Sequence, residues 1–175
     1  VWAGGAAAAV VLPPAGYASL AALGVTDSKR LSPRRRERLY PEIYRWALAV
    51  GIGSATVPEI QRLNILTASL LAMERAIAAL GMPPDLCRID GNQPLRFQEI
   101  APLPQATVVK GDVHHLEIAA ASIVAKVWRD RAIAALDATY PGYDLARNKG
   151  YPTTAHRAAL AKLGPSPLHR WPGTG

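Results

Sequence analysis

The sequence has a single cysteine and no apolar run long enough to cross a membrane. Cys87 has no partner for an intramolecular disulfide, so a reducing, cytoplasmic setting fits the chain best. The apolar stretches fall short of the roughly 20 residues that a membrane-spanning helix needs, and the first residues lack the basic start of a signal peptide. We therefore expect neither a disulfide-rich secreted domain nor a membrane protein.

Aromatic residues are also scarce, at 6% of the chain, and acids are outnumbered by basic residues. Half of the residues are apolar, mostly small aliphatic ones, which is typical of a soluble α/β domain. Lys and Arg total 20 against 13 acids, a net charge of +7. This excess favours an acidic partner, most often nucleic acid, although a protein that is simply basic has the same composition. With 175 residues and no repeat or linker, a single domain over residues 1–175 is expected.

Hydrophobic patterns predict alternating strands and helices along the chain. Short β-branched or small apolar runs predict strands at residues 5–12, 52–56, 85–90 and 106–110. Apolar residues at helical spacing predict helices that begin near Pro33 and Val57 and that cover residues 63–80, 116–138 and 154–163. Pro41 predicts a kink or break in the first helix, and Thr56 with Glu59 forms a capping box for the second. Residues 13–31 and 141–153 are expected to be connections.

Two carboxylates stand at the ends of predicted strands. Asp90 ends one strand and Asp112 follows another. If these strands are parallel neighbours, their ends lie about 5 Å apart, at the sheet edge where α/β folds bind ligands. A cation such as Mg²⁺ would relieve the repulsion between the two acids, and paired ions can promote attack on a phosphodiester. Asp90 could instead begin a turn and Asp112 cap a helix, and the spacing leaves both interpretations open.

Basic side chains recur in four short segments that adjoin an acid or a glycine turn. They are Lys29, Arg30, Lys110, Lys126, Arg129, Arg131, Arg147 and Lys149. Each alone is typical of a solvated surface, but together beside a metal site they would follow a phosphate backbone. Tyr151 comes directly after the Lys149-Gly150 turn. Its ring could stack on a sugar or base, or it could be a half-buried loop tyrosine.

Seven short segments occur in order along the chain: DSKRLS (27–32), RLNILTASLLAM (62–73), IDGN (89–92), VVKGD (108–112), AAASIVAKVWRDR (119–131), YPGY (140–143) and NKGYPTTAH (148–156). Together they resemble bacterial ribonuclease HII. Each segment alone is a weak signal, but the ordered set is specific. The resemblance implies a ribonuclease-H-like fold, in which helices flank a mixed, mostly five-stranded sheet and the C-terminal part is helical.

The resemblance also implies an activity and a set of site residues. The expected reaction is hydrolysis of RNA in RNA–DNA hybrids, including single ribonucleotides embedded in duplex DNA, with two Mg²⁺ or Mn²⁺ ions. The IDGN and KGD segments place catalytic metal ligands at Asp90 and Asp112, and the KGY segment places the junction-reading tyrosine at Tyr151. The nucleic-acid-binding residues expected beside Tyr151 are Lys29, Lys110, Lys126 and Lys149. We expect a monomer that binds no membrane.

The sequence departs from the family pattern at its start. Family members carry an Asp-Glu pair and a Gly-Arg-Gly turn, in a DEAGRG-like segment on a central first strand. The sequence given begins at Val1, after the point where that segment would stand. We therefore expect the first strand and two of the four metal carboxylates to be missing. An alternative interpretation follows, in which the chain is a truncated, catalytically impaired fragment that binds hybrids.

Overall fold

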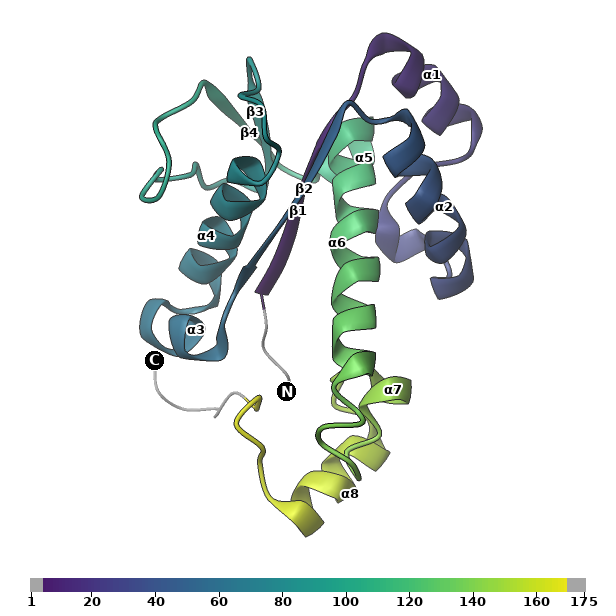
Figure 1. Ribbon diagram of the computed structural model, residues 1–175, viewed down its shortest axis with the longest axis vertical. Coiled ribbons are helices and arrows are strands. Elements are labelled where there is room, and N and C mark those ends of the chain that lie inside the picture. The colour runs from purple at the N-terminus through teal and green to yellow at the C-terminus, as the bar shows by residue number, and fades with distance from the viewer. Residues whose placement is uncertain (1–4, 170–175) are drawn as a thin grey trace.

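The computed structural model describes residues 5–169. An antiparallel ribbon of two strands lies at the centre, where β1 (Gly5–Val11) pairs with β2 (Ala49–Ala55) along its whole length (Figure 1). Both strands were predicted, but β2 begins three residues before the expected start because its register places Ala49 opposite Val11. The ribbon consists largely of alanine, glycine and valine, so helices can approach both of its faces closely.

One face of the ribbon is covered by α4 (Ile65–Ala78), which follows the short helix α3 (Val57–Leu63). The predicted capping box at Thr56 and Glu59 is confirmed as the start of α3. Three alanines of α4 at helical spacing are fully buried against the ribbon: Ala68, Ala72 and Ala76. Gly53 of β2 meets this helix so closely that an added Cβ would lie 2.1 Å from the Ala72 carbonyl oxygen.

The other face is covered by α6 (Leu116–Ala135), with α1 (Pro14–Ala22) and α2 (Pro33–Trp46) packed outside it. The prediction that residues 13–31 form only a connection is wrong, because Pro14 begins a helix. Proline suits a first helical position, where its missing N–H has no intrahelical partner. A break at Pro41 is also not observed: α2 continues to Trp46, held by the fully buried side chain of Ile43.

A second, parallel pair of strands stands beside this layer. β3 (Cys87–Asp90) pairs with β4 (Gln105–Val108), and Asp90 lies opposite Val108. The two strands are therefore parallel neighbours, which is the condition that the sequence set for Asp90 and Asp112 to lie close together. Cys87 and Ile89 point into a core shared with Ile77 of α4. The one-turn helix α5 (Gly111–His114) follows β4 and leads into α6.

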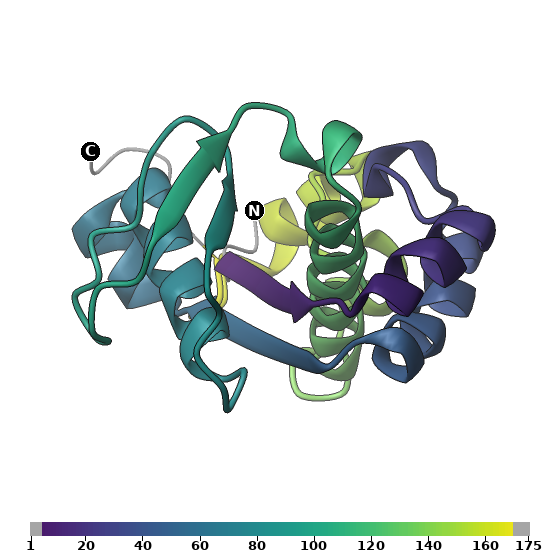
Figure 2. The same ribbon diagram turned by 90° about the horizontal axis from the view of Figure 1, so that it is seen from above.

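The two pairs of strands do not join into one sheet. Within residues 5–169, β1 pairs only with β2 and β3 only with β4, and Figure 2 shows the two pairs as separate ribbons. A cavity of about 900 Å³ adjoins both β1 and β3. Its lining includes residues 6–12 on one side and 86–90 on the other. The five-stranded sheet implied by the resemblance is thus present as two ribbons of two strands. The first strand of the family has no counterpart in the part of the chain described.

The C-terminal part is helical, as expected. α7 (Leu145–Asn148) and α8 (Thr154–Leu163) lie beyond the end of α6, and Gly164 ends α8 with a φ of 73°. The predicted connection at residues 141–153 therefore contains a single helical turn. A further one-turn 3-10 helix, η1 (Ser28–Arg30), precedes α2. No helix within residues 5–169 is both long enough and apolar enough to cross a membrane.

Candidate active site

Asp90 and Asp112 come together at the C-terminal end of β3 and β4. The Asp90 Oδ1 accepts a hydrogen bond of 2.9 Å from the backbone N–H of Gly111. Asp112 follows Gly111 directly in the chain, so this bond keeps Asp112 near Asp90. Gly111 permits this approach because a Cβ there would lie 2.5 Å from Ile118 Cδ1 and 3.3 Å from Asp90 Oδ1. The glycine between Lys110 and Asp112 thus allows the turn to close against β3.

Asp112 is only 6% exposed. Burial raises the pKa of its carboxyl, and the negative charges of Asp90 and Asp27 raise that pKa further. Lys29 acts in the opposite direction, with its Nζ 3.7 Å from Asp112 Oδ2. The electrostatic surroundings therefore disfavour the ionised form of Asp112 unless more positive charge arrives.

This donor set suits a hard divalent cation. Mg²⁺ and similar ions take oxygen ligands and commonly use one or two carboxylates with several waters, which Asp90 and Asp112 can supply. Within residues 5–169, however, no three His, Cys, Asp or Glu side chains are grouped so that they could hold one ion. The described residues thus fit one loosely held ion better than a complete site for two.

Lys29 is held next to Asp112 by the tightly bonded segment 27–31. The Arg36 guanidinium is buried and donates hydrogen bonds of 2.8 and 2.6 Å to the carbonyls of Ser28 and Leu31. The Ser28 hydroxyl hydrogen-bonds to that of Ser122 on α6 at 2.7 Å. The Lys29 side chain nevertheless stays 83% exposed, so it can reach a ligand in solution.

Tyr151 lies against two basic side chains of α6. The Lys126 Nζ is 4.6 Å from the centroid of the Tyr151 ring and the Arg129 Cζ is 5.1 Å from it. Lys126 also donates a hydrogen bond to the Tyr151 hydroxyl. All three residues line the same cavity as Lys29 and Asp90, so the structure brings most of the predicted site residues to one place.

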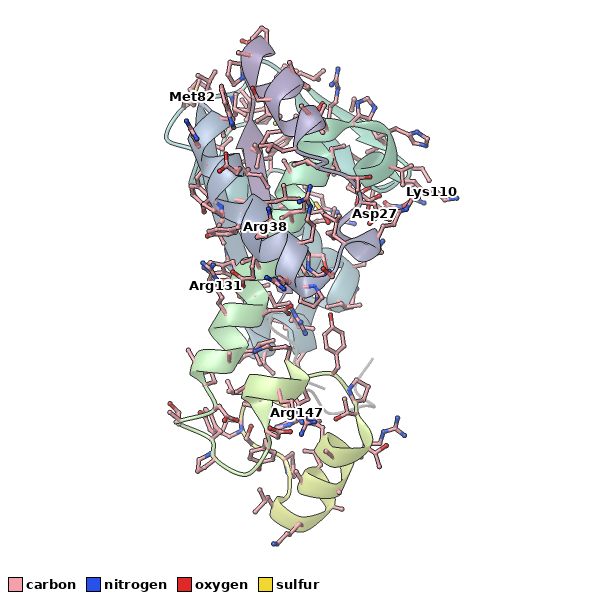
Figure 3. All side chains as sticks on the ribbon, turned by 90° about the vertical axis from the view of Figure 1, so that its right-hand side faces the viewer. Asp27, Arg38, Met82, Lys110, Arg131 and Arg147 are labelled. Carbon is pink, nitrogen blue, oxygen red and sulfur yellow. The ribbon has the colours of Figure 1, made fainter. Side chains whose placement is uncertain are left out.

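The other predicted basic residues lie outside this cavity. Lys110 is exposed, in a left-handed conformation just ahead of Gly111, and Lys149 donates to the Ala146 carbonyl. Arg131 packs over the Tyr40 ring at 4.6 Å and pairs with Glu37, toward α2 (Figure 3). The expected single groove therefore includes only part of the basic set.

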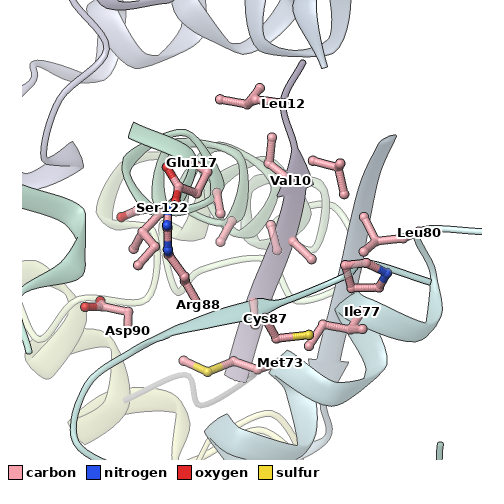
Figure 4. A pocket seen from close by; sticks show the side chains of 18 of the residues that line it. Val10, Leu12, Met73, Ile77, Leu80, Cys87, Arg88, Asp90, Glu117 and Ser122 are labelled. Atoms are coloured by element: carbon pink, nitrogen blue, oxygen red, sulfur yellow. Dashed lines mark hydrogen bonds and ion pairs between the residues drawn. The ribbon is translucent and has the colours of Figure 1, made fainter. Parts of the chain in front are cut away.

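Sequence reasoning missed several polar side chains near the site. Arg88 reaches from β3 to pair with Glu117 of α6 inside the cavity, on the same strand as Asp90 (Figure 4). Burial alone would raise the pKa of Glu117, but hydrogen bonds from its own backbone and from Arg88 lower it. Nothing in the spacing of these two residues signals their contact, because it joins a strand to a later helix.

A buried histidine pair lies beneath the Tyr151 loop. His156 Nε2 is 3.2 Å from His169 Nε2, and both rings are almost inaccessible to solvent. His156 also contacts Asn148, whose side-chain oxygen accepts a hydrogen bond from the N–H of Gly150. The two histidines therefore support the turn that carries Tyr151. The sequence analysis had assigned no role to either histidine.

Comparison with known proteins places this geometry in a family. Residues 2–172 match the family model described as Ribonuclease HII. Ribonuclease HII of Synechococcus elongatus is 58% identical over 163 residues, which cover 93% of this chain and 74% of that protein. Similarity at this level over nearly the whole chain goes beyond a shared architecture.

Solved structures share the fold at lower identity. The ribonuclease H2 from Pyrococcus horikoshii OT3 superposes with a TM-score of 0.71 at 21% identity, covering 94% of this chain and 90% of that one. Bst-RNase HIII, solved in complex with Mn²⁺, has a TM-score of 0.69 at 20% identity, covering 90% and 64%. These likenesses establish a ribonuclease-H-like fold, and with the match over residues 2–172 they lead to one conclusion: the chain belongs to the ribonuclease HII family of hydrolytic ribonucleases.

Proposed function

We propose that the chain is an endoribonuclease that hydrolyses RNA in RNA–DNA hybrids and at single ribonucleotides embedded in duplex DNA. One observation carries the proposal. Asp90, Lys29, Lys126 and Tyr151 line one cavity, and Asp112 lies beside Asp90 and Lys29. Cleavage of a phosphodiester at such a site uses three kinds of group: carboxylates that bind a metal, cations that bind phosphates, and an aromatic ring that packs on a sugar.

Asp90 and Asp112 are proposed to hold the divalent metal. A bound Mg²⁺ or Mn²⁺ supplies Lewis-acid stabilisation of the charge that develops on the scissile phosphate. Gly111 keeps the Asp90 carboxylate oriented through its N–H. The Mn²⁺ complex of Bst-RNase HIII supports a divalent metal for this fold, and the mutual repulsion around Asp112 supports a cation at this place.

Lys29, Lys126 and Tyr151 are proposed to bind the nucleic acid. Lys29 is exposed beside Asp112, where its ammonium can contact a phosphate next to the metal. Tyr151 is 46% exposed, so part of its ring can pack on the sugar that carries the 2′-hydroxyl. Lys110 and Lys149 are proposed to contact phosphates farther along the duplex, because both lie outside the cavity.

The test uses a duplex with one embedded ribonucleotide and a matched all-DNA duplex, each in Mg²⁺ and in Mn²⁺. In a version extended ahead of Val1 by a strand with an Asp-Glu pair, we expect cleavage of the first duplex alone. Tyr151→Ala should weaken the protein's preference for the ribonucleotide-containing duplex more than it weakens the affinity for duplexes in general, since stacking contributes about 1–3 kcal/mol. Equal losses on the two duplexes would argue against a reading role for Tyr151.

A second candidate function is hybrid binding without cleavage. It is favoured by the finding that residues 5–169 contain no group of three metal-binding side chains. In that case a gel-shift experiment would show preferential binding of the ribonucleotide-containing duplex, while the same sample would release no cleaved product in either metal. Efficient cleavage in that sample would exclude the binding-only interpretation.

A further inference from the structure

The Lys126 and Arg129 side chains share one acidic partner, Asp130. Its Oδ1 is 3.3 Å from Lys126 Nζ and 3.2 Å from Arg129 Nη1. The three side chains are only 24%, 19% and 18% exposed, so their charges are less screened than on an open surface. In the described part of the chain, Asp130 is the one acid that forms an ion pair with either cation.

The two cations in turn hold Tyr151, which belongs to a separate segment of the chain. Both approach its ring within the range of cation–π attraction, and Lys126 also bonds its hydroxyl. The loop that carries Tyr151 turns sharply, with left-handed φ angles of 51° at Lys149 and 74° at Gly150. The backbone thus brings the tyrosine to α6, and contacts with the cations define how its ring lies.

Without Asp130, Lys126 and Arg129 would lose the acidic partner that they share. Two like charges near one ring repel each other, and long basic side chains carry considerable rotamer entropy that opposes a single conformation. A carboxylate in contact with both cations offsets the repulsion and restricts both side chains. Asp130 is linked to Tyr151 through Lys126 and Arg129, so its proposed influence on the ring is indirect.

We propose that Asp130 is a positioning residue: it fixes Lys126 and Arg129 against Tyr151 and so orients the ring for the sugar of a ribonucleotide in duplex DNA. This inference rests on the proposed function of Tyr151 as the residue that meets the ribonucleotide. It assigns to Asp130 a part in specificity, separate from general affinity for nucleic acid.

The first test needs no nucleic acid. The protein is labelled with fluorotyrosine, and the Tyr151 resonance is assigned as the fluorine signal that disappears in Tyr151→Phe. In Asp130→Asn this signal should move toward the position of a solvent-exposed tyrosine, while Asp130→Glu should keep it near the wild-type position. An unchanged Tyr151 resonance in a folded Asp130→Asn protein, as judged by circular dichroism, would overturn the proposal.

The second test compares affinities for the ribonucleotide-containing and all-DNA duplexes, without Mg²⁺ or Mn²⁺. Asp130→Asn should lower the ratio of the two affinities by about fivefold, a part of the stacking contribution. Its affinity for all-DNA duplex should stay equal or rise, because the substitution removes one negative charge. A purely structural defect would instead lower both affinities together, and that outcome would overturn the proposal.

Glu37→Gln provides the matched control. It also removes an acid that pairs with a basic residue of α6, Arg131, but that pair packs on Tyr40 rather than Tyr151. Its affinity ratio should equal the wild-type ratio, and a fall like that of Asp130→Asn would overturn the specific role of Asp130. If the wild type shows no ribonucleotide preference, the proposed function fails, and the fluorine measurement still decides whether Asp130 holds the ring.

Discussion

At the scale of single residues, Asp112 carries a charge that its surroundings oppose. Burial and the neighbouring acids raise its pKa, so the folded state binds this proton more tightly than the unfolded state does. The folded state therefore loses stability relative to the unfolded state as the pH rises through the raised pKa. If Asp112 holds a metal as proposed, it lowers the stability of the metal-free protein and raises the affinity for the cation.

Asp112→Asn separates these two effects. In a version of the protein that cleaves hybrids, the substitution should reduce cleavage by about 100-fold or more, as expected when charge stabilisation at the reacting phosphate is lost. The metal-free variant should unfold at an equal or higher temperature than wild type, because the unfavourable charge is gone. The exposed Asp144, changed to Asn, is the control for cleavage and should leave the rate unchanged. Wild-type rates for Asp112→Asn across a Mg²⁺ titration would contradict the assignment.

Lys29 is an exposed cation that forms an ion pair with Asp112. If its ammonium contacts one phosphate, Lys29→Ala should reduce by about one unit the slope of log affinity against log salt concentration. Lys162→Ala removes an exposed lysine of α8, outside the cavity, and should leave the slope unchanged. Identical slopes for both variants and wild type would show that Lys29 makes no phosphate contact.

At the scale of elements, the packing of α4 on β2 depends on the absence of side chains. An alanine at position 53 would place its Cβ 2.1 Å from the Ala72 carbonyl oxygen, and backbone cannot yield easily. Gly53→Ala should destabilise the protein by about 1–3 kcal/mol, the usual range for overpacking. Gly5→Ala on β1 is the control, since its Cβ would meet nothing closer than 3.7 Å. The measurement is the thermal unfolding midpoint of each variant, and equal midpoints for Gly53→Ala and Gly5→Ala would contradict the prediction.

The C-terminal helices depend on a chain of hydrogen bonds through two buried histidines. His169 Nδ1 accepts a bond from the N–H of Ser166 at 3.0 Å, so its Nε2 carries the hydrogen and donates to His156 Nε2. His156 Nδ1 is then left to donate to the Tyr143 carbonyl at 3.3 Å. Protonating His169 would add a hydrogen at its Nδ1, so that this nitrogen and the Ser166 N–H would be two donors facing each other.

This arrangement predicts a loss of stability in mild acid. Burial first, and then nearby positive charge, lower the pKa of His169 below its usual 6.5. The contribution of this site is therefore fully present above pH 6.5 and is lost as the pH falls toward the lowered pKa. Thermal midpoints from pH 8 to pH 5 should fall less steeply in His169→Gln than in wild type. His114→Gln, at an exposed histidine, should follow the wild-type curve, and an equal pH dependence in all three would contradict the prediction.

At the scale of the whole molecule, the cavity between β1 and β3 is the main departure from the expected sheet. The edges of both strands face it without a strand partner among residues 5–169, and free strand edges favour association between chains. We expect residues 1–175 alone to be nearly inactive and prone to aggregate. A version extended ahead of Val1 by a strand with an Asp-Glu pair and Gly-Arg-Gly should be more soluble and should cleave hybrids.

A matched extension with Asn-Gln in place of Asp-Glu separates folding from catalysis. It should recover solubility and thermal stability without cleavage of a duplex that carries one ribonucleotide, in Mg²⁺ or in Mn²⁺. If residues 1–175 cut as fast as the acidic extension, the four-carboxylate assignment is wrong for this protein. Asp27 would then be the first acid to examine, because it adjoins Asp112, whereas Glu59 is paired with Arg75 and Glu74 accepts the N–H of Ile100.

Local patterns in the sequence were sufficient for most elements and for the central acids. The capping box at Thr56 and the existence of β3 and β4 follow from residue type and spacing, because they depend on neighbours a few positions away, although the predicted strand 106–110 ends two residues beyond Val108, where β4 ends. The family also followed from short segments in order. α1 was missed because Pro13 and Pro14 were read as the end of structure, although proline also suits the start of a helix.

The sequence by itself therefore determined the family, most of the helices and strands, and the positions of Asp90 and Asp112 next to the ends of two strands, whereas the parallel pairing that brings the two acids together came from the tertiary structure. Only the tertiary structure decided that β1 and β3 stand apart, that Asp27 adjoins Asp112, that Asp130 reaches Tyr151 through two cations, and that His156 meets His169. These contacts join segments far apart in the chain or unrelated in pattern. They arise from how the helices pack on the strands, which no local periodicity encodes.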